Sequence, residues 1–357
     1  MPITDHELNV LTDQAVSLLI DLIKIPAFSK DESARATYLY DYLLSQKLFP
    51  KRVENNIILK GNHDPVKKKV LLNSHIDTVK PVGGWVYNPH EPVLRDGKLT
   101  GLGANDAGAS VVSLLAAYQY LSKQSLTYEL IYAASAEEEI SGHHGIVEVI
   151  NEIGRVDLAI VGEPTGMNMA IAEKGLMVLD GLAKGKSGHA AREEGINALY
   201  VAIEDIQKIK SFAFDKVSSL LGKTQASVTM IHAGTQHNVV PDECKYVIDV
   251  RANELYTLPE IHDLLQSQVS STLTPRSFRL KPSHIDVHHP IVIKGKELGL
   301  SSYGSPTLSD QSLLSCTSIK IGPGQSSRSH TADEYILVEE IRNAIRIYVE
   351  LLGGLNL

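Results

Sequence analysis

One short segment sets the organisation of this chain: Val70-Leu71-Leu72-Asn73-Ser74-His75-Ile76-Asp77. It opens with apolar residues and closes with polar ones, which is the pattern of a buried strand with functional groups at its end. The segments 128–135 and 158–161 repeat this pattern, and acidic residues follow both of them. Between the strands lie helical patterns, of which Ala109–Ser122 is the most apolar. Short apolar strands that alternate with helices predict an α/β layer with largely parallel strands.

The rest of this layer is predicted on either side of these strands. Apolar residues recur at helical spacing over Asp5–Lys24, and a second helix is predicted over Ser33–Gln46. A short strand is expected at 56–59. Near the C-terminus, Ser318–Gly324 predicts another buried strand and Val338–Leu352 a closing helix.

The middle of the chain has a different order of elements. It predicts strand, helix, strand, strand, helix and strand, the βαββαβ order of a small ferredoxin-like sandwich. The predicted elements are Leu176–Ala183, Gly195–Lys210, Ser227–His232, Cys244–Arg251, Thr257–Ser270 and Ser277–Ile285. We therefore expect a first domain in two parts, 1–174 and 286–357, with a second domain, 175–285, inserted between them.

Composition excludes several classes of protein. The chain has 357 residues, 43% of them hydrophobic, which suits two domains with real cores. Lys and Arg number 34 against 42 Asp and Glu, and a net charge of −8 argues against nucleic acid or an anionic membrane as the main partner. No window approaches the roughly 18 apolar residues of a membrane span, and the N-terminus lacks the pattern of a signal peptide. Cys244 and Cys316 are far apart, which fits two small buried side chains in a reducing cytoplasm.

Polar side chains gather at the C-terminal ends of the predicted strands, where open α/β sheets place their ligands. They are His75, Asp77, Asp106, Glu137-Glu138-Glu139, Glu163 and His330. Each has an ordinary structural explanation when taken alone, such as a helix N-cap for Asp106 or a solvated turn for the three glutamates. Two histidines with several carboxylates, and no cysteine among them, are however typical donors for Zn²⁺, Mn²⁺ or Co²⁺ in a catalytic site.

The local patterns refine this metal hypothesis. Asp77 lies two residues after His75 and so on the same side of an extended strand, where its carboxylate can orient the imidazole. Adjacent glutamates cannot all face one ligand, so one is expected to bind metal and another to move protons. The loop 101–106 begins like a dinucleotide fingerprint, but Asp106 takes the place of the third glycine and would repel a pyrophosphate.

In this order and spacing, the segments resemble the two-zinc family of acetylornithine deacetylase, succinyl-diaminopimelate desuccinylase, aminoacylase and related carboxypeptidases. The resemblance covers essentially the whole chain. It is carried by Ser74–Val79, Gly101–Asp106, Ser135–Gly142, Val161–Thr165, Lys186–Ala191, Asn238–Pro241, Asp249–Arg251, Gly322–Gly324 and Ser329–Tyr335. It implies a zinc-peptidase-like catalytic domain, with a mixed sheet flanked by helices, and an inserted ferredoxin-like α+β lid that often dimerises.

The resemblance implies a centre of two divalent metal ions, with zinc as the first expectation and cobalt or manganese as alternatives. One ion would be bound by His75 and Glu163, the other by Glu139 and His330, and Asp106 would bridge them. Many members follow the bridging aspartate with x-Lys-Gly, whereas Ala-Gly-Ala follows it here. That lysine is not a metal ligand, so the departure concerns the subfamily rather than catalysis.

Further roles are implied for residues around the ions. Asp77 would be the acid that supports His75, and Glu138 would be the general base. His189 resembles the lid histidine that reaches a neighbour's active site and polarises the scissile carbonyl. Asn238 and Arg251 resemble lid residues that hold the substrate's carboxylate or acyl group. Plainer alternatives stay open for these three: a turn histidine, a turn asparagine and a strand-end salt bridge.

The implied reaction is metal-assisted hydrolysis of the amide bond of a small N-acyl amino acid. The first expectation is deacetylation of N-acetylornithine in arginine biosynthesis; the alternatives are N-acyl-citrulline, N-succinyl-diaminopimelate or a dipeptide as substrate. A catalytically silent relative that only binds acyl amino acids or peptides would lack a ligand or the base, yet all six positions are present. The expected partners are the small-molecule substrate and, through the lid, a second copy of the chain, with no nucleic acid and no membrane.

Overall fold

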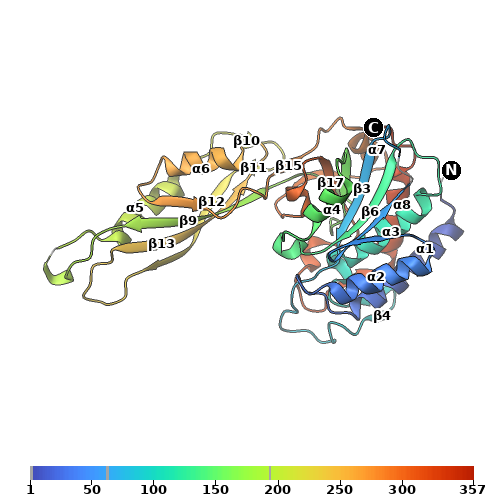
Figure 1. Ribbon diagram of the computed structural model, residues 1–357, viewed down its shortest axis with the longest axis horizontal. Helices are drawn as coiled ribbons and strands as arrows, with labels where there is room; N and C mark the ends of the chain where they lie inside the picture. The colour runs from blue at the N-terminus through green and yellow to red at the C-terminus, as the bar shows by residue number, and fades with distance from the viewer. Residues whose placement is uncertain (1–2, 62–63, 193) are drawn as a thin grey trace. The chain divides into compact units, whose positions relative to one another are not determined.

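The chain forms two units in the computed structural model. The described residues are 3–61, 64–192 and 194–357. The first unit holds the chain up to Ile171, together with His284–Tyr303 and Ser309–Leu357. The second unit holds Ala172–Ser283 and a short later segment, Gly304–Leu308. Figure 1 shows both units, coloured along the sequence.

A mixed sheet is the centre of the first unit. Its strand order is β1-β2-β6-β3-β7-β17-β8-β15, with β16 beside β8. The strands are β1 (Lys51–Val53), β2 (Asn56–Lys60), β3 (Lys69–His75), β6 (Glu129–Ser135), β7 (Leu158–Val161), β8 (Met169–Glu173), β15 (Ser283–His284), β16 (Ser302–Ser305) and β17 (Thr317–Lys320). β3 pairs in parallel with β6 and β7, and β17 pairs in parallel with β7. The antiparallel pairs β1–β2, β2–β6 and β17–β8 flank this parallel centre.

Helices cover both faces of the sheet, which is why nearly every residue of its central strands β3, β6 and β7 is buried. On one face lie α1 (Asp5–Ile23), α3 (Ala109–Leu121) and α8 (Val338–Leu352), and Tyr132 of β6 donates a hydrogen bond to the carbonyl of Val111 in α3 at 3.1 Å. On the other face, α4 (Ile146–Ile153) packs on Leu71 and Ile131. None of the described helices has the length and apolar composition that a membrane crossing requires.

The sequence predictions for this unit are largely confirmed. The predicted helices correspond to α1, α2 (Ser33–Ser45), α3 and α8, and the predicted strands to β2, β3, β6 and β7. The predicted strand Ser318–Gly324 is too long, because β17 ends at Lys320. Pro323 has no N–H for a ladder, and Gly324 adopts a φ of 83°. Helices α4 and α7 (Pro290–Glu297) were not predicted.

A small separate sheet was also missed. It pairs β18 (Tyr335–Leu337) with β5 (Lys98–Thr100) and β5 with β4 (Val93–Arg95), both antiparallel. These strands of three residues are too short to produce a readable period. Their pairing places the segment that follows His330 beside the loop that carries Asp106.

The second unit has the predicted βαββαβ order. Its elements are β9 (Gly175–Lys184), α5 (Ala198–Ser211), β12 (Gln225–Ala233), β13 (Glu243–Ala252), α6 (Leu258–Gln266) and β14 (Thr272–Pro275), with a small hairpin of β10 (Val217–Ser218) and β11 (Gly222–Lys223). The sheet runs β12-β13-β9-β14, with each neighbouring pair antiparallel. This is the strand order of a ferredoxin-like sandwich, as the sequence predicted.

In this unit the last helix was predicted to end too late, and the last strand was predicted to begin too late. Helix α6 ends at Gln266 rather than at Ser270, and β14 lies at Thr272–Pro275 rather than at 277–285. The cause is Asp205 of α5, which is buried and accepts hydrogen bonds from the backbone N–H and hydroxyl groups of Ser270 and Ser271. These bonds end the helix early and direct the chain into β14.

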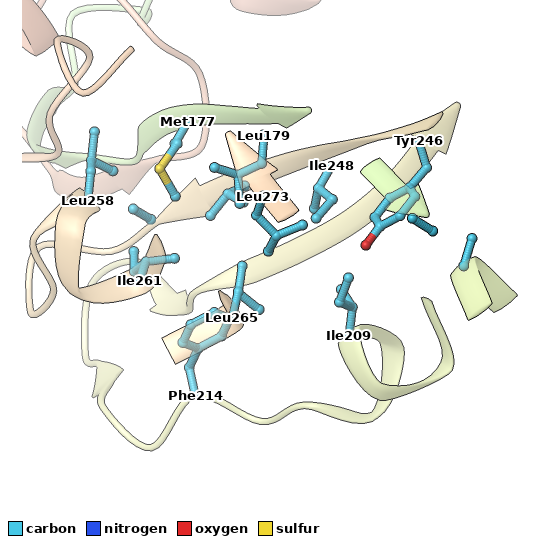
Figure 2. Close-up of a cluster of buried hydrophobic side chains, with 14 of the residues drawn as sticks. Met177, Leu179, Ile209, Phe214, Tyr246, Ile248, Leu258, Ile261, Leu265 and Leu273 are labelled. Atoms are coloured by element: carbon cyan, nitrogen blue, oxygen red, sulfur yellow. The ribbon is translucent and has the colours of Figure 1, made fainter. Parts of the chain in front are cut away.

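One face of this sheet carries the core of the second unit. Figure 2 shows Tyr246 and Ile248 of β13 directed toward Ile209 of α5 and Leu265 of α6. Along β13, buried residues alternate with more exposed ones such as Lys245. The alternation has a period of two, so the other face of the sheet is the more polar one.

Asp205→Ala is expected to destabilise the second unit by about 2–3 kcal/mol, because buried donors of two serines lose their acceptor. Burial by itself would raise the pKa of Asp205, but its serine donors hold the pKa below the usual value. The contribution is therefore present above about pH 4 and lost on further acidification. Urea unfolding at pH 7 and pH 3 measures both effects, with exposed Glu204→Ala as the control. An equal loss at both pH values would contradict this account.

Candidate active site

The parallel strands of the first unit bring the predicted site residues together. His75 is the last residue of β3, Glu138 and Glu139 follow β6, and Glu163 follows β7. Because β6 and β7 both pair in parallel with β3, the C-terminal ends of all three strands lie at one edge of the sheet.

His75 is the buried centre of one half of the cluster. Its Nε2 lies 3.2 Å from Oδ1 of Asp106, 3.7 Å from Oε1 of Glu163 and 3.9 Å from Oε2 of Glu138. Its Nδ1 contacts the backbone oxygen of Asp77 at 2.9 Å, and the Asp77 carboxylate at 3.4 Å. The Nδ1 atom of His75 is therefore engaged by Asp77, whereas its Nε2 atom faces three carboxylates.

Asp77 also fixes the turn that carries the two glutamates. Its carboxylate accepts hydrogen bonds from the backbone N–H of Glu138 at 3.1 Å and of Glu139 at 3.2 Å, and from the hydroxyl of Ser29 at 2.7 Å. Glu137 has a different partner: its carboxylate accepts a hydrogen bond from the backbone N–H of His144. The three glutamates therefore do not all face one partner, and the roles expected for Glu138 and Glu139 stay predictions.

Asp106 lies between the two halves of the cluster. Its Oδ1 faces His75, and its Oδ2 is 3.7 Å from Nε2 of His330. That imidazole nitrogen also contacts Oε2 of Glu139 at 3.0 Å. The N-cap interpretation of Asp106 is wrong, because α3 begins at Ala109 after Gly108 and has no side-chain cap.

The charges of this cluster are unbalanced. Burial raises the pKa of Glu138 and of Glu163 well above the usual range, and neighbouring carboxylates raise both further. The hydrogen bond to Glu139 raises the pKa of His330 to about 9. Four carboxylates that converge on two imidazoles form a negative site that added positive charge would stabilise.

The donor atoms fit divalent metal ions. Two sets of side chains each bring three possible ligand atoms within 4.8 Å of one another: His75, Asp106 and Glu139, and His75, Glu138 and Glu163. Oε1 of Glu139 is buried and has no hydrogen-bond partner among the described residues. Nitrogen and oxygen donors without sulfur suit Zn²⁺, Mn²⁺ or Co²⁺.

Sequence reasoning missed three buried residues that support these ligands. Glu334 accepts hydrogen bonds from the loop that carries Asp106. The side chain of Asn105 donates hydrogen bonds to Gln325 and Ser329, in the segment before His330. Asp310 accepts hydrogen bonds from Asn73 at 2.7 Å and Ser135 at 2.8 Å, beneath the strand ends. Asn105 and Glu334 lie inside the quoted segments Gly101–Asp106 and Ser329–Tyr335, but nothing in either segment singles them out.

In the second unit, the structure brings two of the three predicted residues together. The N–H of Ala190 donates to the carbonyl of Asn238 at 3.1 Å, and His189 forms a β-bridge with Val239. His189 and Asn238 line one pocket, and the loops that carry them extend beyond the same end of the sheet (Figure 1).

Arg251 lies at the other end of that sheet. In the β13–β9 ladder it pairs with Leu176, whereas the ladder ends toward the His189 loop at Glu243 and Lys184. Eight strand residues at about 3.3 Å each place Arg251 roughly 26 Å from that end. Its guanidinium forms two hydrogen bonds with Asp249, at 2.8 and 3.1 Å, so the strand-end salt bridge is present.

Comparison with known proteins identifies the class of protein that carries this site. The sequence model of peptidase family M20/M25/M40 matches residues 71–353, and the chain belongs to this family. It is therefore a metallo-amidohydrolase, and the resemblance predicted from the sequence is confirmed.

Relatives with different substrates align over most of the chain. An acetylornithine deacetylase of Proteus mirabilis is 28% identical, over 75% of this chain and 74% of the relative. A succinyl-diaminopimelate desuccinylase of Wolbachia pipientis is 25% identical, over 78% and 76%. A [LysW]-lysine/[LysW]-ornithine hydrolase of Saccharolobus solfataricus is 26% identical, over 96% of both chains.

Solved structures share the fold. A tripeptidase of Staphylococcus aureus superposes with a TM-score of 0.75 at 20% identity, over 96% of this chain and 97% of its own. A dinuclear metal-binding peptidase of the M20 family from Bacillus subtilis gives 0.74 at 15% identity, over 96% and 98%. The predicted α/β catalytic fold with a ferredoxin-like insertion is thus confirmed.

Asp106→Ala is expected to retain less metal than Glu138→Ala, because the Asp106 carboxylate faces both histidines whereas Glu138 lies near only one. Metal analysis after gel filtration, with Glu204→Ala as the control, measures the difference. Equal metal contents in the two site variants would show that Asp106 does not serve both halves of the cluster.

Proposed function

We propose that this chain hydrolyses the amide bond of a small N-acyl amino acid at a centre of two divalent metal ions. Zinc is the first candidate, and cobalt or manganese are alternatives. The observation that carries the proposal is the placement of Asp106. One of its carboxylate oxygens faces His75, and the other faces His330. The dinuclear relative from Bacillus subtilis supports a pair of ions.

The contacts suggest how the ligands divide. His75 and Glu163 would hold one ion, Glu139 and His330 the other, and Asp106 would contact both. The distances of 3.7 Å from His75 to Glu163 and 3.0 Å from His330 to Glu139 support this division. When bound, two such ions supply a lowered water pKa and a polarised carbonyl group.

Glu138 is the proposed general base. It is a neighbour of Glu139 but faces the other half of the cluster, and it lies farther from His75 than the proposed ligands Asp106 and Glu163 do. Its carboxylate would take a proton from the attacking water and deliver it to the leaving amine. Asp77 would keep Nε2 of His75 directed at the cluster through its contacts with Nδ1.

N-acetylornithine is the first proposed substrate, which would place the enzyme in arginine biosynthesis. N-acyl-citrulline, N-succinyl-diaminopimelate and dipeptides are the alternatives. The related deacetylase and desuccinylase differ in their named acyl groups, so they support the class of substrate rather than one member. Release of free amine from a panel of N-acetyl and N-succinyl amino acids would decide among them.

The two free cysteines support a cytoplasmic location.

The second unit supports a homodimer. A small amino-acid derivative cannot span the roughly 26 Å of strand that separates Arg251 from the loop of His189 and Asn238. If all three contact one substrate, two copies of the unit must contribute, with His189 polarising the scissile carbonyl of the partner's substrate. Strand β12 is an edge of its sheet and exposes Met230 and Ile231, which a second copy could cover.

Glu138→Gln is expected to lower kcat by at least about 10²-fold and to leave the metal content unchanged, because the amide cannot accept the proton of the water. Steady-state kinetics and metal analysis on the same preparation measure this. Glu148→Gln, in α4, is the matched control. If Glu138→Gln keeps most of its activity, another group is the base.

His189→Ala is expected to lower kcat by about 10²–10³-fold without loss of metal. Mixing inactive His189→Ala with inactive Glu138→Ala should then restore activity as subunits exchange, because each mixed dimer has one site with both residues intact. The two variants carry different affinity tags, so the mixed dimers can be purified and assayed. Inactive mixed dimers would show that His189 acts within its own chain or only supports the lid.

A further inference from the structure

One buried carboxylate, that of Glu334, holds the loop that carries Asp106. Its Oε1 accepts hydrogen bonds from the backbone N–H of Asn105 and of Asp106, both at 2.8 Å, and its Oε2 accepts that of Gly103 at 3.2 Å. Its backbone carbonyl accepts the N–H of Gly101 at 2.9 Å. A single residue that is 2% exposed therefore holds the loop, through its side chain at residues 103 to 106 and through its backbone at residue 101.

Glu334 also belongs to the segment that presents the second histidine. It follows His330 by four residues and directly precedes β18, whose Tyr335 pairs with Thr100 of β5. The β18–β5 ladder thus sets the two segments side by side, and the Glu334 side chain continues the connection into the site.

Asn105 joins the same two segments from the other direction. Its Oδ1 accepts the N–H of Gln325 at 2.9 Å, and its Nδ2 donates to the carbonyl of Gln325 at 3.1 Å and to Ser329 Oγ at 3.3 Å. Asn105 is fully buried. The loop of Asp106 is therefore tied to the chain both before and after His330.

We propose that Glu334 is a positioning residue for the metal centre, which sets the placement of Asp106 relative to His330 without touching substrate. The inference rests on the proposed two-ion site. Three N–H groups converge on the side chain, and only a carboxylate can accept all three with two oxygens. A glutamine in this place would turn its own N–H₂ toward one of them.

The charge of Glu334 argues for a role beyond holding the fold. Burial and the nearby Asp106 carboxylate raise the pKa of Glu334 to about 8, so its ionised form is disfavoured in the protein without cations. Cations bound nearby would favour that form. Glu334 should therefore matter more for metal affinity than for the stability of the protein without metal.

The test compares Co²⁺ binding by wild type, Glu334→Gln and Glu334→Asp, each first stripped of metal with a chelator. The visible absorption of bound Co²⁺ reports its coordination, and competition with a chelating dye gives the affinity. Both variants are expected to bind Co²⁺ about 10–100-fold more weakly than wild type, with an altered spectrum. The aspartate keeps the charge but is one methylene too short to reach all three N–H groups. With saturating substrate and Co²⁺, kcat should fall more than KM changes.

Two controls separate positioning from general stability. Glu339→Gln makes the same substitution on an exposed side chain of α8 and should leave Co²⁺ binding unchanged. Asp205→Asn weakens a buried carboxylate that holds a loop in the second unit, so it should lower the melting temperature but not the Co²⁺ affinity.

The outcomes distinguish this inference from the proposed function. Wild-type Co²⁺ affinity and spectrum in either folded variant would overturn it and leave Glu334 as a purely structural residue. If Glu334→Gln does not fold, Glu334→Asp decides by the same measurement. A wild-type protein that binds fewer than two Co²⁺ ions would overturn the two-ion proposal, and with it this inference. Two ions in wild type and weaker binding in the variants would support both.

Discussion

The parallel pairing of β3 with β6 and β7 is the constraint on which the rest of the first unit depends. It sets the ends of three strands at one edge, so that His75 and the residues after β6 and β7 meet without any contribution from distant loops. Because both faces of the sheet are buried under helices, its register is strongly specified. A slip by one residue would move His75 to the opposite face and dissolve the cluster.

Three further carboxylates support the acidic cluster, and each of them accepts hydrogen bonds from backbone or side-chain donors. The N–H groups of the turn after β6 bind Asp77, and those of the loop before α3 bind Glu334. Asp310 beneath the strand ends is bonded by two side chains from β3 and β6. These three supporting carboxylates are thus held by hydrogen-bond donors, and they in turn fix the segments that carry the proposed ligands. The ligands can remain close together although they repel one another.

The sequence was informative where function depends on residues next to a strong local pattern. His75, the acidic turn after β6 and Glu163 could be found because each follows an apolar strand. Glu334, Asn105 and Asp310 could not, because each acts on a segment more than 150 residues away and has no pattern of its own. The misplacement of β14 has the same origin: its start depends on Asp205, which lies in a helix 66 residues from Ser271.

The two units differ in whether a single copy brings together all the residues proposed for its task. All proposed metal ligands come from the first unit, and their mutual distances follow from its main sheet, the small β18–β5–β4 sheet and the connecting loops. The candidate substrate contacts of the second unit are divided between opposite ends of one sheet, with His189 and Asn238 at one end and Arg251 at the other. If His189 and Arg251 contact one substrate as proposed, metal binding would be a property of the single chain, whereas turnover would depend on the proposed dimer. Loss of the dimer should then abolish catalysis while the ions remain bound. The arrangement of the metal ligands alone would not separate metal binding from turnover in this way.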